Sequence, residues 1–363
     1  MNDLSTTIKT NLRPTTWTQF FEIIEKASEK MTLCIDEFPY LVASDPSLPS
    51  VMQKWIDHAE KNNVLIILNG SSQQMMKSLF LNESSALFSR ADRILKIEPM
   101  NYSAFCKFCG LSKSDINSFI KYSLVGGIPK YWNYIDKKTS CIDLADKLYF
   151  SALALLETEP RRVMTDEKVD GLSALSILEL IGRGAHKPGE IASRMSARQT
   201  TLSKVFQQLI ESNLIIKETP FGKLEKDSKS TLYKLADPML QFWFGVFSPH
   251  RSRWTNYTKT EKEKLVYDHA SKVFEFEIRK LIPESKRYWD STVEFDCVYQ
   301  NKKKIIHVCE IKFKKLTSAE NTAVQNTLKL KIQNLGKASP IFKDRSIEAT
   351  VLGWTEFVKM LED

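Results

Sequence analysis

Two short apolar runs stand out in the first third of the chain. Met31–Ile35 reads MTLCI and stops at two acids, and Val64–Leu68 reads VLIIL and stops at Asn69. Continuous apolar runs of this length are typical of buried strands in parallel sheets. Residues 51–62 lie between them and have helical spacing. The pattern therefore predicts a strand, a helix and a second strand of an α/β core.

Helical patterns continue from residue 101 to residue 158, interrupted by Gly126, Gly127 and Pro129. The charged stretch 157–170 contains Pro160 and is predicted to be a boundary. Three helices are then expected, at residues 172–182, 188–195 and 198–212, and two strands, at 214–218 and 231–235. In the third helix Leu202, Val205, Phe206, Leu209 and Ile210 form one apolar stripe. Three helices followed by a two-stranded wing predict a winged helix.

The last third is predicted to mix helix and sheet. A helix is expected at residues 271–281, and two strands, 293–299 and 304–313, flank the basic turn 300–303. The expected domains are a partial α/β core at 1–100, a helical subdomain at 101–165, the winged helix at 166–240 and a second α/β domain at 241–363.

The composition and the motifs that are absent disfavour several classes of protein. No apolar run approaches the roughly 20 residues that span a bilayer, and the polar first residues lack a secretory signal, so no membrane association is expected. The six cysteines are scattered, which favours a reducing cytoplasm over a disulfide framework. Cys106 and Cys109 form an isolated CxxC that is read as structural. No HExxH or GxSxG motif occurs, which disfavours zinc and serine hydrolases.

The positive charge is concentrated near the end of the chain. The net charge is +8, and from residue 251 onward 22 Lys and Arg stand against 16 Asp and Glu. The last third thus contributes +6 of the +8, which permits nucleic-acid binding in that part.

The acids that end the first apolar run suit phosphate chemistry. Asp36 could help to hold Mg²⁺, and Glu37 could polarise a water towards the γ-phosphate of a nucleotide. Asn69, at the end of the second run, is placed to touch the same water or phosphate. Acids also end many strands that have only a structural role.

Several segments together resemble the archaeal-type prokaryotic P-loop ATPases of the AAA+/STAND group, which carry a C-terminal domain of unknown function. The matching pieces, in order, are LCIDEFPYL, LIILNGSSQQMM, ALFSRADRILKIEPMNYSAF, YSLVGGIPKYW, the winged helix and the EFD…EIK block. The resemblance implies that Asp36 and Glu37 are the Walker B carboxylates, with Asp36 on the magnesium side. It also implies that Asn69 is the sensor residue and that Arg90 senses phosphate charge. A surface role for Arg90 is the alternative.

The sequence departs from this family at the phosphate-binding loop. No GxxxxGK[ST] motif occurs, so the main contacts to the phosphates of ATP are absent from the chain. Either the chain is a truncated or split member of the family, or it is a degenerate member that has kept the fold and lost the reaction. A separate polypeptide that supplies the Walker A part is a third possibility.

A second candidate chemistry lies in the predicted C-terminal hairpin. Glu310 and Lys312 are two residues apart on a strand and therefore face the same side, and Asp296 lies on the preceding strand. Asp296 and Glu310 could hold Mg²⁺ while Lys312 orients or helps to deprotonate the water that attacks a phosphodiester. The spacing resembles the PD-(D/E)xK restriction-endonuclease-like core, in which Glu275 matches a further acid. A solvated strand face is the alternative.

The third helix of the winged helix offers a polar face for DNA. Its residues are Arg198, Gln199, Thr200, Ser203, Lys204 and Gln207. The leading interpretation is a DNA-associated member of the ATPase family with a metal-dependent nuclease domain. The alternative is a non-enzymatic regulator that binds DNA or protein through its winged helix.

Overall fold

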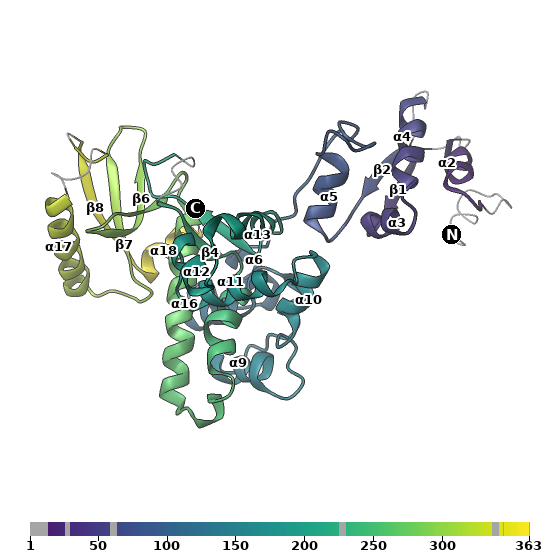
Figure 1. Ribbon diagram of the computed structural model, residues 1–363. Helices are drawn as coiled ribbons and strands as arrows, with labels where there is room; N and C mark the ends of the chain where they lie inside the picture. The colour runs from purple at the N-terminus through teal and green to yellow at the C-terminus, as the bar shows by residue number, and fades with distance from the viewer. Residues whose placement is uncertain are drawn as a thin grey trace. The chain divides into compact units, whose positions relative to one another are not determined.

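The computed structural model describes residues 14–25, 30–58, 64–224, 230–335, 341–343 and 345–362. The chain forms two compact units (Figure 1). The first comprises Met1–Ile97 with Thr165–Lys168, and the second comprises Glu98–Met164 with Val169–Asp363. Among the described residues, no helix is both long enough and apolar enough to cross a membrane.

The first unit contains the predicted α/β core. Strands β1 (Met31–Ile35) and β2 (Val64–Leu68) pair in parallel, with Met31 opposite Val64 and Ile35 opposite Leu68. Both strands end where they were predicted to end. The helix between them starts earlier than predicted, and residues 59–62 of that prediction lie outside the described residues. The helices of this unit are α2 (Trp17–Glu25), α3 (Phe38–Ser44), α4 (Leu48–His58) and α5 (Gln73–Phe80).

The second unit begins with short helices, as predicted. They are α6 (Tyr102–Cys109), α7 (Ile116–Val125), α8 (Pro129–Trp132), α9 (Cys141–Ala145), η1 (Asp146–Phe150) and α10 (Glu159–Asp166). Helix α10 occupies most of the stretch that was predicted to be a boundary. Cys106 is fully buried in the core and Cys109 is partly buried beside it, so both pack in the fold as expected.

The next segment has the predicted order of three helices and a hairpin. Its helices are α11 (Leu172–Gly182), α12 (Pro188–Arg194) and α13 (Gln199–Glu211), and its strands are β3 (Ile215–Glu218) and β4 (Leu232–Leu235). The strands pair antiparallel, with Ile215 opposite Leu235. Leu202, Phe206 and Leu209 of α13 are buried, which confirms the apolar stripe. These elements are called the helix–hairpin segment below.

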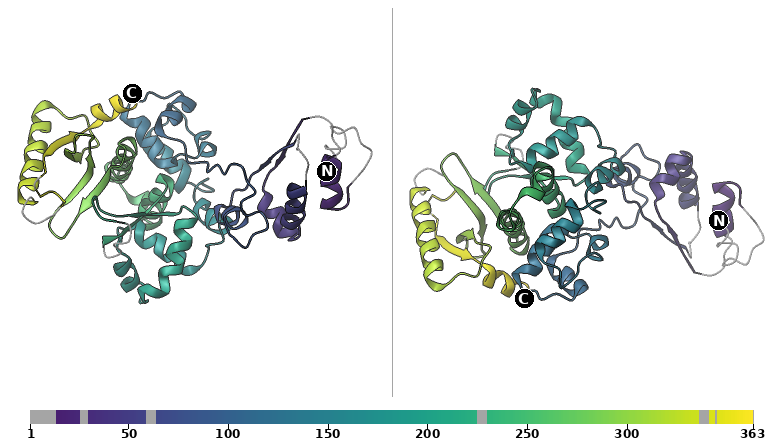
Figure 2. Two further views of the ribbon diagram at one scale, coloured as in Figure 1. Left: turned by 90° about the horizontal axis from the view of Figure 1, so that it is seen from above. Right: turned by 90° about the horizontal axis from the view of Figure 1, so that it is seen from below.

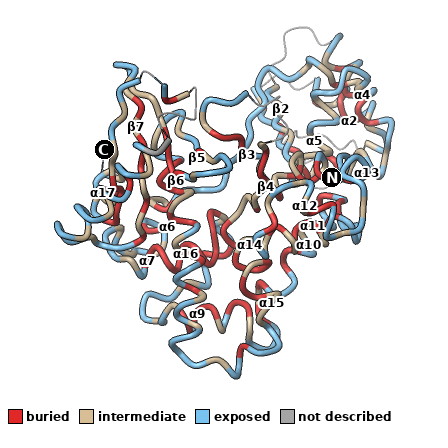
Figure 3. Tube along the Cα trace, turned by 60° about the vertical axis from the view of Figure 1, so that its left-hand side comes forward, coloured by how far each residue is buried: buried red, intermediate tan, exposed pale blue. Residues whose placement is uncertain are grey.

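The chain between the hairpin and the last sheet is helical. It comprises α14 (Pro238–Phe242), η3 (Trp243–Phe247), α15 (Ser248–His250), η4 (Trp254–Asn256) and α16 (Lys259–Leu281). Buried residues run through α11, α14 and α16 in one hydrophobic core (Figure 3). Helix α16 is twelve residues longer than predicted, because Thr258 and Glu261 cap it reciprocally.

The C-terminal sheet has four strands in the order β5-β6-β7-β8. They are β5 (Lys286–Trp289), β6 (Glu294–Gln300), β7 (Ile306–Ile311) and β8 (Ile347–Leu352), with α17 (Ser318–Leu335) before β8 and α18 (Trp354–Met360) after it. The first three strands are antiparallel, whereas β8 is parallel to β7. Helix α17 packs on β7 and β8, and α16 packs on β6, so helices lie on both faces of the sheet (Figure 2). The predicted hairpin β6–β7 is confirmed.

Candidate functional sites

Two strands and a helix of the second unit bring four predicted residues together. Glu275 lies on α16, Asp296 on β6 and Glu310 on β7, and Lys312 follows the end of β7. All four side chains are partly exposed, so they are accessible from solvent. These residues are called the carboxylate–lysine cluster.

The backbone around Asp296 is irregular. Between Lys286 and Tyr288 the pairing of β5 with β6 shifts in register, so β6 carries one extra residue between Phe295 and Val298. Such bulges re-aim the side chain of a strand residue and are common beside functional sites. Here the Oδ2 atom of Asp296 accepts a hydrogen bond of 2.8 Å from the backbone N–H of Ile311. The aspartate is thereby fixed against the next strand.

Two lysines hold Glu310. Lys312 Nζ donates to Glu310 Oε1 at 2.8 Å, and Lys331 Nζ, from α17, donates to Glu310 Oε2 at 3.3 Å. The first contact was expected from the spacing of the two residues on the strand. Lys331 was not among the predicted residues, because it lies on a separate helix and no spacing in the sequence connects it with β7.

The charges of the cluster interact. Burial, and then the negative charge of Asp296, raise the pKa of Glu275 to about 7. Burial also raises the pKa of Asp296. Although burial opposes it, the contact with Glu310 raises the pKa of Lys312, and contacts with the two lysines lower the pKa of Glu310. At neutral pH the cluster therefore has one carboxyl that can take up or release a proton and one lysine that stays charged.

The donor set of the cluster suits a small hard cation. Across the described parts of the chain, no group of three or more His, Cys, Asp or Glu side chains is arranged to hold a metal ion. Mg²⁺ is commonly bound by only one or two carboxylates, with waters and substrate phosphates completing its shell. Asp296 and Glu310 provide two such carboxylates, so these residues fit Mg²⁺.

The first unit brings together three of its four predicted residues. Asn69 Nδ2 donates to Asp36 Oδ1 at 2.7 Å, and the hydroxyl of Ser71 donates to Glu37 Oε2 at 3.0 Å. Glu37 has a left-handed backbone conformation, with φ of 50°, which is uncommon for a residue other than glycine. The residues that follow the carboxyl ends of β1 and β2 thus form one polar edge. Ser71 also belongs to this edge and was not among the predicted residues.

Arg90 has a different environment. Its guanidinium forms a two-point contact with Asp57 of α4, at 2.9 Å from Nε and 2.8 Å from Nη2. The bond to Arg90 lowers the pKa of Asp57. The structure therefore does not bring Arg90 to the polar edge at Asp36, and its observed role is an ion pair with α4.

The predicted nucleic-acid face of α13 is exposed. All of its six side chains are exposed to solvent, from the N-cap to the middle of the helix. Two of them make hydrogen bonds within the helix, from Gln207 to Glu211 at 2.7 Å and from the hydroxyl of Ser203 to the carbonyl of Gln199 at 3.2 Å. The face is free to meet a partner, and the structure does not select between DNA and protein.

Similarity to known proteins is consistent with an archaeal and bacterial family. Residues 243–324 match a family model described as archaea bacterial proteins of unknown function. An uncharacterized protein of Methanocaldococcus jannaschii is 26% identical over 347 aligned residues, which span 88% of this chain and 75% of that protein. The segment that matches the family model contains the whole carboxylate–lysine cluster. These similarities assign no reaction.

Proposed function

We propose that the chain is a nucleic-acid-associated protein whose C-terminal sheet cleaves phosphodiester bonds with the help of Mg²⁺. The observation that carries the proposal is the convergence of Glu275, Asp296, Glu310 and Lys312 at one accessible place. The order helix, three antiparallel strands, helix and parallel strand supports it, because the PD-(D/E)xK resemblance implies this core. The net positive charge of the last third of the chain suits a polyanionic substrate.

The chain's own residues divide the reaction into binding, orientation and proton transfer. Asp296 and Glu310 would hold Mg²⁺, which when bound supplies Lewis-acid polarisation of the phosphodiester and of its attacking water. Lys312 stays protonated at neutral pH, so it orients the water and stabilises negative charge that develops on the phosphate. It is not suited to be the general base.

Glu275 is suited to that role, because its pKa of about 7 lets it accept a proton near neutral pH. The water oxygen forms a new bond to phosphorus and its proton passes to Glu275. The bond from phosphorus to one sugar oxygen breaks, and this oxygen takes a proton from solvent.

The helix–hairpin segment is proposed to dock the nucleic acid. Its three helices and antiparallel hairpin have the order of a winged helix, and α13 presents an exposed polar and basic face. A helix of this kind can enter the major groove, while its lysine and arginine contact phosphates. If the cluster proves inactive, this face still supports the alternative of a DNA- or protein-binding regulator.

For the first unit we propose a nucleotide-related role that needs a second polypeptide. Asp36, Glu37 and Asn69 form the polar edge that a Mg²⁺–ATP site requires, but the sequence has no phosphate-binding loop. A separate polypeptide that carries such a loop would complete the site. The alternative is a unit that has kept the edge and lost the reaction.

The test of the main proposal is DNA cleavage by the purified full chain. Single-stranded, double-stranded and branched DNA are incubated with Mg²⁺ or Mn²⁺, beside the variants Glu310→Ala and Lys312→Ala. Glu320→Ala is the matched control, since Glu320 is a nearby acid that pairs with Lys314 outside the cluster. We expect cleavage by the wild type and by the control alone. Intact DNA with every substrate, or equal cleavage by all variants, would refute the nuclease.

A further inference from the structure

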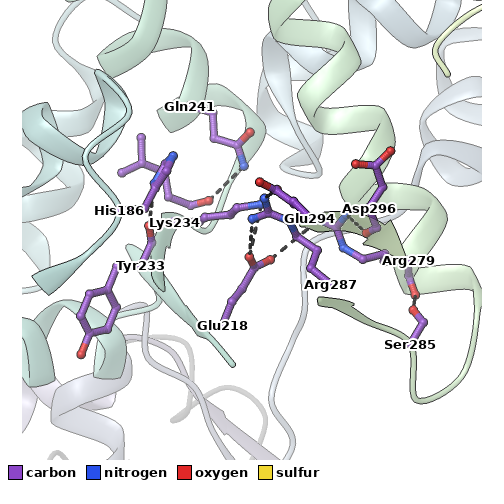
Figure 4. Close-up of polar contacts among 11 residues, drawn as sticks. His186, Glu218, Tyr233, Lys234, Gln241, Arg279, Ser285, Arg287, Glu294 and Asp296 are labelled. Carbon is purple, nitrogen blue, oxygen red and sulfur yellow. Dashed lines mark hydrogen bonds and ion pairs between the residues drawn. The ribbon is translucent and has the colours of Figure 1, made fainter. Parts of the chain in front are cut away.

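A largely buried carboxylate links the helix–hairpin segment to the C-terminal sheet. Glu218, on β3, is surrounded by cations from three other elements (Figure 4). The distances from its oxygens are 3.3 Å to Lys234 Nζ on β4, 3.1 Å to Arg287 Nη1 on β5 and 3.8 Å to Arg279 Nη2 on α16. A buried carboxylate in contact with three cations is a strong geometric constraint, because removing it leaves uncompensated buried charge.

Arg279 connects this junction to the carboxylate–lysine cluster. Its Nη1 atom donates a hydrogen bond of 2.9 Å to the backbone carbonyl of Asp296. It also lies one helical turn after Glu275 on α16, so the two side chains share a face. Arg279 is only 8% exposed, and its guanidinium lies between Glu218, with which it forms an ion pair through Nη2, and the strand that carries Asp296. The position of Asp296 thus depends on a residue of the helix–hairpin segment.

A backbone contact strengthens the same junction. The N–H of Phe221, in the loop after β3, donates to the carbonyl of Arg287 on β5 at 2.7 Å. Gly222 follows with φ of +76°, and a Cβ atom there would lie 2.8 Å from Ile341. Any other residue there would strain the backbone and would require the Ile341 side chain to shift.

The charges of the junction also act on the cluster. Five charged residues interact electrostatically with Glu275. They are Asp296 of β6, Arg279 of α16, Lys234 of β4, Arg287 of β5 and Lys312, which follows β7. Burial and Asp296 raise the pKa of Glu275, while the three cations of the junction lower it. Burial lowers the pKa of Lys234 to about 8, although Glu218 opposes this effect.

We propose that Glu218 is a positioning residue of the carboxylate–lysine cluster, so that the helix–hairpin segment and the cluster form one rigid body. Glu218 pairs with Arg279, and Arg279 bonds to the backbone carbonyl of Asp296. This inference rests on the proposed function and adds its regulation. Nucleic acid bound at α13 would act on the same rigid assembly that fixes Asp296.

The test is hydrogen exchange of the Ile311 amide in the full chain, followed by NMR, because this N–H donates to Asp296 Oδ2. Glu218→Gln removes the anion that pairs with Arg279 and should speed the exchange of this amide several-fold. The amide of Leu178, which is buried in α11, reports any general loss of stability. Glu294→Gln is the matched control, because Glu294 also pairs with Arg287 but is 54% exposed.

The outcomes separate the two proposals. Faster exchange of Ile311 in Glu218→Gln, with unchanged exchange of Leu178 and no change in Glu294→Gln, supports the positioning role, since general destabilisation would speed both amides alike. Unchanged exchange of Ile311 overturns it. If Glu218→Gln does not fold, the same measurement on Arg279→Lys decides. Selective exchange of Ile311 with no metal-dependent cleavage would refute the nuclease and leave the positioning intact.

Discussion

Lys331 Nζ lies 3.3 Å from Glu310 Oε2, although the two residues are 21 positions apart and belong to different elements. The contact connects α17 to β7 at the centre of the carboxylate–lysine cluster. With Lys312 on the other oxygen, both oxygens of Glu310 are engaged by lysines. A cation that binds Glu310 must therefore compete with these ammonium groups.

We predict that Lys331→Met tightens the binding of Mn²⁺ by several-fold. The substitution frees one oxygen of Glu310 and removes a positive charge that repels the ion. Lys329→Met is the control, because Lys329 is an exposed lysine of the same helix. Isothermal titration calorimetry of the full chain measures both affinities. Equal affinities in the two variants would argue that Glu310 is not a ligand.

DNA binding should depend on the exposed face of α13. Arg198→Ala and Lys204→Ala are each expected to weaken binding and to reduce the slope of log affinity against log salt by about 1. Lys147→Ala removes one exposed positive charge from a different part of the chain and should leave the slope unchanged. Fluorescence anisotropy with a labelled duplex, at several salt concentrations, gives the slopes. A wild-type slope near zero would exclude DNA contact by this face.

Gly126 and Gly184 provide a matched test of packing. Both have positive φ, of 65° and 97°, so alanine strains the backbone at either position by about 1–3 kcal/mol. At Gly126 a Cβ atom would also lie 2.7 Å from the buried carboxylate of Asp237, whereas nothing lies within 4 Å at Gly184. Gly126→Ala should therefore destabilise the chain more than Gly184→Ala does in denaturant unfolding. Equal losses would show that the Asp237 contact is unimportant.

The isolated chain should not bind Mg²⁺–ATP tightly. The polar edge at Asp36 and Asn69 is formed, but the backbone cradle and lysine that normally hold the phosphates are absent from the sequence. Calorimetry with ATP and Mg²⁺ is expected to show no micromolar binding. Micromolar binding that weakens in Asp36→Ala would contradict this and would mean that the site works without its loop.

Much of the fold could be predicted where local signals are sharp. Strands β1 and β2 were predicted with correct bounds, because Asp36 and Asn69 end their apolar runs abruptly. Helix α11 was predicted equally well. Helix α16 was predicted too short, since its first turns are polar, although Thr258 and Glu261 signalled the true start. Strand β5 was missed, because its sequence KRYW is short and half charged.

The candidate site was predictable only in part, for geometric reasons. Glu310 lies near the end of β7 and Lys312 follows two residues later, which brings their side chains to the same side, and the hairpin brings Asp296 beside them. The register shift at Asp296 and the approach of Lys331 come from the packing of the sheet and of α17, which no local pattern specifies. The pair of Arg90 with Asp57 was likewise not foreseen. The register shift, the position of Lys331 and the Arg90–Asp57 pair all depend on tertiary contacts between elements that are distant in the sequence.

The most direct test of the central claim is binding of Mn²⁺ to the full chain, followed by electron paramagnetic resonance. The account predicts one site that is lost or greatly weakened in Asp296→Asn and in Glu310→Gln. Asp290→Asn should retain it, because Asp290 holds the turn before β6 through Thr292 and lies outside the cluster. Equal binding by the wild type and all three variants, or no binding by the wild type, would contradict the assignment of Asp296 and Glu310 as the metal ligands.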